Sequence, residues 1–299
     1  MNKQKTLFLL RASLSFEGRS LTLYEEVHPI ETKETAATHS AFLATLKLLL
    51  PPFSHPIIVT DAGFKRPWFK AVRGQGWHFM GRVRGRVCLS NNGEKGLLCK
   101  TLFPQATSTA KLMKNWYMGN VNPYKINMVL YKAKPVGRIA KTAKGQRQQS
   151  NYSRKNARRA HDPWILVTSL PARRGLAKRA VGIYEKRMQI EEAFRDCKSK
   201  RFGLGMTLHG TKQQQRMSIL VLIGTIVHTI LITLGLLAEQ QGIQRRFQAN
   251  SIKDRRVLSY MNLGLRLYKK SSWRFSVDVW RDTLILLLDK LSLAQKVTA

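Results

Sequence analysis

The stretch AKRAVGIYEKRMQIEEAFRDCKSKRFGLGM, Ala177–Met206, contains the most informative spacing in the chain. An α-helix turns by about 100° per residue, so residues three, four or seven positions apart return to the same side. Four residues with chemically active side chains follow this spacing and would lie within roughly 60° of one another. They are Tyr184, Arg187, Glu191 and Lys198. The pattern predicts a helix that presents one acid between a phenol and two cations.

A second stripe of the same predicted helix is apolar and would face a core. It consists of Ile183, Ile190, Phe194 and Cys197. An apolar stripe beside the charged one favours a partly enclosed site, since a fully solvated face has no need of it. The alternative is that the charged residues are ordinary i,i+4 partners on a wet surface.

The composition points to a polyanionic partner. The 299 residues include 52 Lys and Arg against 17 Asp and Glu, which gives a formal net charge of +35. Repulsion on this scale opposes compaction unless a polyanion binds, and nucleic acid and membrane surfaces are the usual ones. Cys88, Cys99 and Cys197 show neither disulfide nor zinc spacing, which favours a reducing, cytoplasmic compartment.

The order of apolar patterns predicts an α/β protein. Residues 6–15 and 20–27 read as a hairpin, and Glu34–Leu50 reads as a helix stopped by Pro51 and Pro52. Further strands are predicted at Pro56–Thr60, Gly76–Val83, Ile126–Tyr131 and Trp164–Leu170, and a closing amphipathic helix at Thr283–Leu293.

Asp61 follows the apolar strand Pro56–Thr60 directly. Carboxylates at the carboxyl end of a buried strand are often catalytic, because the loops there are open to substrate. Position alone, however, favours a turn residue or the N-cap of a helix that starts at Phe64. Both interpretations remain open at this point.

Two further segments bear on the kind of partner. Lys132–Arg159 holds ten Lys or Arg and no acid, a composition whose natural ligand is a phosphate backbone. Met217–Ala238 has no charged residue and is long enough to span a bilayer. Its His228, its glycines and its hydroxyl residues favour a buried helix in an α/β core instead.

The available acids suit metal-dependent phosphodiester chemistry. Mg²⁺ prefers carboxylate oxygens, and two such ions can activate a nucleophile and stabilise a leaving oxygen. Asp61 and Glu191 are the best placed acids, whereas Glu192 is rotated away from the charged stripe. Arg187 and Lys198 could bind flanking phosphates. Neither a phosphate-loop motif nor G-x-G-x-x-G is present, so nucleotide hydrolysis has no support.

The residues also carry a family resemblance. Tyr184, Arg187, Glu191 and Lys198 match Y-x2-R-x3-E-x6-K without a gap, and the stretches LLRASLSFEGRSLTLYE, IIVTDAGFKRPWFKAV and DPWILVTSLP extend the match over nearly the whole chain. This pattern resembles the bacterial insertion-sequence transposases of family four, which have an Asp-Asp-Glu active site. The resemblance implies a ribonuclease-H-like core with a β-rich insertion. It also implies cut-and-paste transposition of double-stranded DNA through nicking, a hairpin intermediate and strand transfer.

The resemblance assigns roles to individual residues. It makes Asp61 and Glu191 the catalytic ligands of Mg²⁺, with Mn²⁺ as a possible substitute. Tyr184, Arg187 and Lys198 would hold transposon-end DNA, Trp164 would receive a flipped base, and Arg82 would contact DNA. Related proteins work in a DNA-paired complex, which implies self-association in the cytoplasm, at the nucleoid, without a membrane.

One departure from the family concerns the first aspartate. The family places it on a first core strand, just upstream of the strand that here begins almost at Met1, and no Asp precedes Asp61. We therefore expect an N-terminally truncated and catalytically impaired copy, or a misassigned start codon. The expected divisions are the first part of the core at 1–85, the basic insertion at 86–170, the catalytic and buried helices at 171–240, and a helical region at 241–299.

Two other classes of protein compete with a transposase. A non-catalytic DNA-binding fragment could compete for transposon ends, and it would bind these ends without cutting them. A basic membrane-associated protein depends only on Met217–Ala238, and partition into the soluble fraction at high salt would exclude it.

Overall fold

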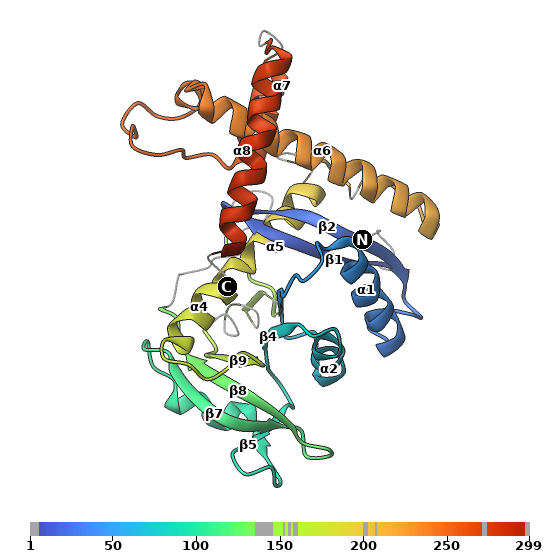
Figure 1. Cartoon of the computed structure of the whole chain (residues 1–299), viewed down its shortest axis with the longest axis vertical. Coiled ribbons are helices and arrows are strands. Elements are labelled where there is room, and N and C mark those ends of the chain that lie inside the picture. The colour runs from blue at the N-terminus through green and yellow to red at the C-terminus, as the bar shows by residue number, and fades with distance from the viewer. Residues whose placement is uncertain are drawn as a thin grey trace. The chain divides into compact units, whose positions relative to one another are not determined.

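The computed structural model describes residues 6–134, 146–151, 153–154, 157, 161–199, 203–206, 208–270 and 274–296. The chain divides into two compact units, each described by itself. One unit is His39–Glu185, and the other combines Met1–Thr38 with Lys186–Ala299. Figure 1 labels most of the helices and strands of the two units.

The His39–Glu185 unit is built on a seven-stranded mixed sheet. The strand order is β3-β4-β9-β8-β7-β5-β6. β3 and β4 run parallel, and the other neighbours are antiparallel. The strands are β3 (Ile57–Thr60), β4 (His78–Arg82), β5 (Cys88–Ser90), β6 (Leu97–Leu98), β7 (Lys111–Met118), β8 (Tyr124–Tyr131) and β9 (Trp164–Thr168), with the short helix η1 (Cys99–Gln105) after β6.

Helices cover both faces of this sheet because successive strand residues point to opposite sides. On β4, Phe79 stacks on Phe69 of α2 (Arg66–Gly74), with ring centroids 4.5 Å apart. The next residue, Met80, joins the buried cluster formed with α4 (Leu176–Lys186) on the other face. α1 (Ala36–Leu49) packs against α2, where the His39 ring lies edge-on to Trp68.

The four strands that the sequence predicts in this unit all form. Pro56–Thr60, Gly76–Val83, Ile126–Tyr131 and Trp164–Leu170 correspond to β3, β4, β8 and β9, with ends shifted by no more than two residues. The predicted helix Glu34–Leu50 forms as α1. The basic block Lys132–Arg159 lies largely outside the described residues.

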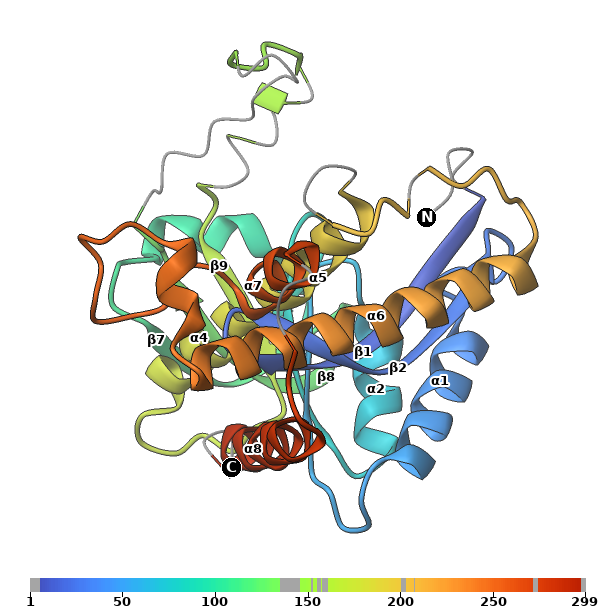
Figure 2. The ribbon, with the colours of Figure 1, turned by 90° about the horizontal axis from the view of Figure 1, so that it is seen from above.

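The second unit begins with the predicted hairpin. β1 (Leu7–Phe16) pairs antiparallel with β2 (Arg19–Pro29) through a two-residue turn. Glu17 and Gly18 both have positive φ, 40° and 87°, as a tight hairpin turn requires. α6 (Gln214–Gln240) runs along this hairpin, as Figure 2 shows, and buries Met217 and Val221 against it.

The C-terminal part of this unit is helical. α6 is followed by η2 (Ile243–Phe247), α7 (Tyr260–Lys269) and α8 (Val277–Lys296), a longer helix than the predicted Thr283–Leu293. α6 and α7 cross very closely. A Cβ on Gly235 would lie 2.0 Å from the Tyr260 carbonyl oxygen, and one on Gly264 would lie 1.9 Å from the Leu231 oxygen. Only glycine permits this approach.

The expectation that Met217–Ala238 forms a buried helix holds only for part of α6. Every residue from Leu231 to Ala238 is buried. Nearer the N-terminus, Ile219, Ile223 and Ile226 are more than half exposed. By length and composition alone α6 could cross a membrane, and half of its most apolar window is buried inside the protein.

We expect Gly235→Ala and Gly264→Ala each to lower the free energy of unfolding by at least about 2 kcal/mol, because the new methyl group would overlap backbone atoms. Chemical denaturation measures this change. Gly182→Ala is the matched control, since a Cβ on this α4 residue meets nothing within 4 Å. It should gain about 0.5–1 kcal/mol, and equal effects at all three positions would contradict the close crossing.

Candidate functional site

Asp61 lies at the carboxyl end of β3 and is exposed. Its Oδ1 accepts a hydrogen bond from the Gly63 backbone N–H at 2.8 Å, which is an Asx turn. α2 starts only at Arg66, with Lys65 as its N-cap, so Asp61 is a turn residue and not a helix cap. No other hydrogen bond of the Asp61 carboxylate is seen among the described residues.

The stretch around Tyr184 and Glu191 forms two helical segments instead of the single expected helix. α4 ends at Lys186, and α5 (Met188–Lys198) begins after Arg187. The Arg187 backbone keeps a helical conformation, with φ −56° and ψ −29°, so the interruption is only one residue long. The sequence contains no proline or glycine there, which is why periodicity alone did not predict it.

Three of the predicted DNA-binding residues form one cluster in the His39–Glu185 unit. The Trp164 and Tyr184 rings meet edge to face, with centroids 5.0 Å apart. The Arg82 guanidinium lies 5.9 Å from the Trp164 ring centroid and donates hydrogen bonds to the carbonyl oxygens of Asp162, at 2.9 Å, and Pro163, at 3.2 Å. Ring packing and the hydrogen bonds of Arg82 therefore hold this cluster together.

Tyr184 and Trp164 are less exposed than residues on a solvated helix face would be. Tyr184 is only 4% exposed and belongs to the buried cluster under α4. Its ring therefore has a packing role. Trp164 is half-buried and also contacts Tyr131, whose ring centroid is 5.7 Å away.

Two other residues of the stripe lie on α5, and Arg187 immediately precedes it. Arg187 Nη2 and Glu191 Oε1 form an i,i+4 ion pair at 2.7 Å, the pairing expected from spacing alone. The Glu191 side chain is 46% exposed, whereas that of Arg187 is 13% exposed. Lys198 is exposed, and its ammonium lies 5.5 Å from the Phe194 ring centroid. α5 thus presents a carboxylate and a cation to solvent.

Buried ion pairs fix the opposite side of α5, and the sequence reasoning missed them. Arg19 on β2 binds Asp196 with Nε and Oδ2 2.5 Å apart. Burial raises the pKa of the Asp196 carboxyl, although the Arg19 charge opposes this shift. The only signal in the sequence was an acid beside Cys197, on the apolar side of the predicted helix, in a chain where acids are scarce.

A second buried pair lies next to the first. Arg11 on β1 binds Glu25 on β2 with Nη2 and Oε2 2.6 Å apart, and its guanidinium lies 4.9 Å from the Phe194 ring centroid. Glu25 also accepts a hydrogen bond from the Thr225 hydroxyl of α6 at 2.5 Å. These contacts tie α5 and α6 to the hairpin.

His228 on α6 is a buried titratable group near the same arginines. Burial, followed by the positive charges of Arg11 and Arg19, lowers its pKa to about 4. Its Nε2 has no hydrogen-bond partner among the described residues. His228 is therefore neutral in the folded protein at pH 7.

Only part of a metal site can be assembled from these residues. Asp61 and Glu191 each offer exposed carboxylate oxygens, which suit a hard divalent cation. Among the residues that the structure describes, no group of three or more His, Cys, Asp or Glu side chains lies close enough to hold a metal ion. The carboxylate oxygens are suitable ligands for a divalent cation. The described residues of neither unit, however, supply a cluster of three such ligands.

Alanine substitutions at Arg187 and Lys198 should affect the stability of the fold differently, because only one of these side chains is largely buried. We expect Lys198→Ala to change the free energy of unfolding by less than about 0.5 kcal/mol, because the side chain is exposed. Arg187→Ala should lower it by roughly 1–2 kcal/mol, because most of that side chain is buried. Denaturant titration of both variants measures the difference, and a larger loss for Lys198→Ala would contradict it.

His228 should make stability pH-dependent. Unfolded histidine binds a proton below about pH 6.5, whereas folded His228 does so only near pH 4. Stability should therefore fall as the pH drops through this window, by up to about 3 kcal/mol in total. We expect His228→Leu to abolish this part of the pH dependence, measured as the difference between the two unfolding profiles from pH 7.5 to 4.5. Parallel profiles would exclude a buried neutral histidine.

Comparison with known families gives one match. A family model described as "Transposase DDE domain" covers residues 3–228, well over half of the chain. No curated protein matches the chain significantly. The family indicates a transposase-type nuclease activity on DNA, and its members generally use divalent metal ions. Asp61 and Glu191 are both exposed and lie within the matched segment. The chain therefore belongs to the transposase DDE domain family.

Proposed function

We propose that the chain is the transposase of a bacterial insertion sequence of family four, similar to the transposase of transposon ten. The observation that carries the proposal is the position of Asp61 and Glu191. Both are exposed carboxylates within the matched segment, one at the end of β3 and the other on α5. The parallel pair β3–β4 joined through α2, and the antiparallel hairpin β1–β2, are compatible with a ribonuclease-H-like core. The division at residues 85, 170 and 240 is part of the same proposal.

The proposed reaction is metal-dependent phosphodiester cleavage followed by strand transfer, in cut-and-paste transposition. Asp61 and Glu191 would hold Mg²⁺ or Mn²⁺, which when bound would activate the nucleophile and stabilise the leaving oxygen. In the structure Arg187 neutralises Glu191. A phosphate that draws Arg187 away would free the carboxylate, so DNA binding and metal binding would support each other.

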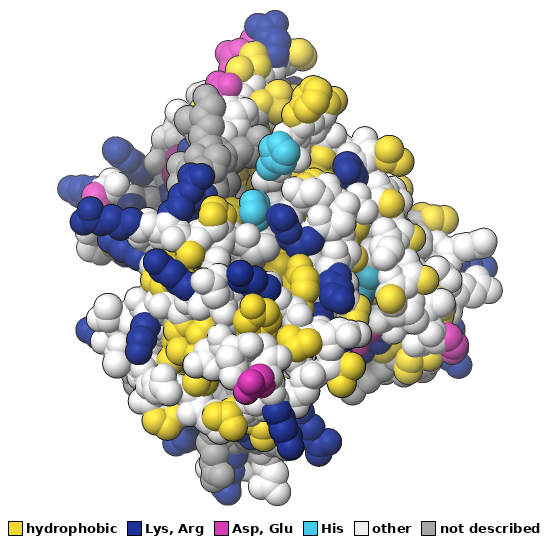
Figure 3. All heavy atoms as spheres, turned by 60° about the horizontal axis from the view of Figure 1, so that its bottom comes forward, with side chains coloured by type: hydrophobic (Ala, Val, Ile, Leu, Met, Phe, Trp, Pro, Cys, Tyr) yellow, Lys and Arg dark blue, Asp and Glu magenta, His cyan; other side chains and the backbone are white. Residues whose placement is uncertain are grey.

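The remaining residues would bind DNA. Lys198 offers an exposed ammonium for a phosphate, and the half-buried Trp164 offers a ring face or edge for a flipped base. Arg82 and Tyr184 hold that ring in place. Figure 3 shows Lys and Arg side chains spread over one face of the protein with few acids between them, which suits a phosphate backbone.

The family resemblance calls for three carboxylates, and it assigns two of these roles to Asp61 and Glu191. Self-association on paired DNA ends, in the cytoplasm at the nucleoid, completes the proposal. A non-catalytic fragment that competes for transposon ends is the second candidate, favoured by the absence of a three-ligand cluster among the described residues.

A plasmid excision assay with Mg²⁺ tests these proposals. Cutting at transposon ends would support the transposase, and Asp61→Asn and Glu191→Gln should then each reduce cleavage by at least about 100-fold.

Glu192→Gln is the matched control, because Glu192 is the neighbour of Glu191 and pairs with Arg195 instead. It should retain cleavage. Binding to transposon ends without cutting would favour the second candidate.

A further inference from the structure

A basic depression lies in the C-terminal part of the chain, beyond the segment matched by the family. It has a volume of about 530 Å³ and lies where η2 and the loop after it meet the end of α7. Its lining includes four exposed cations from these two helices and the residue that follows α7. They are Arg246, Arg266, Lys269 and Lys270. We call this site the basic depression.

Packing and hydrogen bonds hold the uncharged residues that line the depression. Phe247 packs against the buried cluster that includes Ala238, Leu263 and Leu267. The Gln248 side chain donates hydrogen bonds to the carbonyl oxygens of Ile252, at 2.6 Å, and Arg255, at 3.0 Å. It also accepts one from the Val257 N–H at 3.3 Å. Hydrogen bonds of the Gln248 side chain thus hold the loop after η2 in place.

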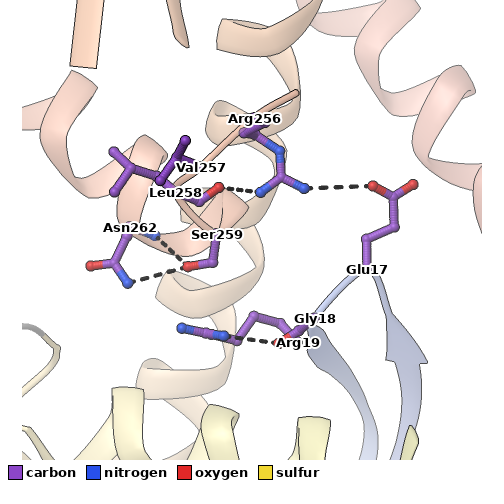
Figure 4. Close-up of a pocket in the computed structure, with 8 residues that line it drawn as sticks. All are labelled: Glu17, Gly18, Arg19, Arg256, Val257, Leu258, Ser259 and Asn262. Atoms are coloured by element: carbon purple, nitrogen blue, oxygen red, sulfur yellow. Dashed lines mark hydrogen bonds and ion pairs between the residues drawn. The ribbon is translucent and has the colours of Figure 1, made fainter. Parts of the chain in front are cut away.

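Acids are scarce around the described residues of the basic depression. No carboxylate among the described residues forms an ion pair with Arg266, Lys269 or Lys270, and no acid lines the depression. A second depression, of about 420 Å³, is different, because Arg256 in its lining is paired with Glu17 (Figure 4). From 242 to 276 the chain has nine Lys or Arg and one acid, Asp254.

The end of α7 favours three of these cations. Arg266 and Lys269 stand in the last turn of α7 and Lys270 follows it, where the helix dipole stabilises cations. Arg246 comes from a separate helix, η2. The positive charges of Arg266, Lys269 and Lys270 still repel one another, and an anion bound between them would relieve this repulsion.

We propose that the basic depression binds the phosphate backbone of duplex DNA. Cations from two separate helices suit a polymer with closely repeated phosphates better than they suit one isolated headgroup. The choice of DNA rests on the proposed function, since the matched domain acts on DNA. The depression would be a DNA-binding site in the C-terminal part of the chain, separate from the contacts proposed for Arg187 and Lys198.

A charge-neutral double variant tests this site. Arg266→Gln with Lys270→Gln should weaken duplex binding and reduce the slope of log affinity against log salt by about 1.8, since each lost phosphate contact removes about 0.9. The matched control is Lys253→Gln with Arg281→Gln, which removes one Lys and one Arg beside acids. Arg281 pairs with Asp278 in the structure. Equal slopes for the two double variants would overturn the proposal.

A second measurement needs no variant and is independent of folding defects. Duplex DNA should protect Lys269 and Lys270 of the wild-type chain from amine acetylation, with Lys253 left reactive as the internal control. Equal reactivity of all three lysines with and without DNA would overturn the proposal.

The outcomes separate this site from the proposed function. If binding depends on Arg187 and Lys198 but not on the basic depression, only the present inference fails. If the wild-type chain does not bind duplex DNA, both fail. If the Arg266→Gln, Lys270→Gln double variant loses binding to phosphatidylserine vesicles but binds duplex DNA as the wild type does, the depression is a lipid site. That result would also overturn the proposal.

Discussion

The placement of α5 depends on the buried ion pair between Arg19 and Asp196. An eleven-residue helix is only marginally stable by itself, so its position comes from tertiary contacts. Removal of either partner would leave a buried, uncompensated charge, at a cost of about 3–5 kcal/mol. Because this pair holds the inner side of α5 to the hairpin, the outer side presents Glu191 and Lys198 to solvent. The proposed chemistry therefore relies on a contact in which no catalytic residue takes part.

Local patterns predicted the elements better than the contacts between them. Alternating and helical periodicities were enough for the hairpin, α1, β3, β4, β8 and β9, since these depend on neighbouring residues. Arg19 and Asp196 are separated by 177 positions, so no local pattern could pair them. The spacing did place Tyr184 on the side of Arg187, but it could not show that the phenol ring lies in the core. The roles of Asp61 and Glu191 came from family resemblance, since Asp61 alone resembled a turn residue.

Scarce acids and abundant cations serve different purposes in this molecule. Several of the few carboxylates are used internally: Asp196 and Glu25 hold the hairpin, while Glu17 and Glu239 share Arg256 and the Tyr260 hydroxyl. The resulting pairing removes acids from the surface and leaves many cations there without local neutralisation. A net charge of +35 is then a property of the outer surface more than of the interior. Affinity for a phosphate polymer follows from that division.

The glycine crossing of α6 and α7 also bears on how the gene can change. Every glycine codon begins with two guanines, and any substitution at either base replaces glycine with a residue that has a Cβ or with a stop. At Gly235 and Gly264 that Cβ has no room. Four nucleotides therefore tolerate no change in this part of the reading frame. The half-exposed isoleucines of α6, by contrast, can drift among apolar residues without loss of the fold.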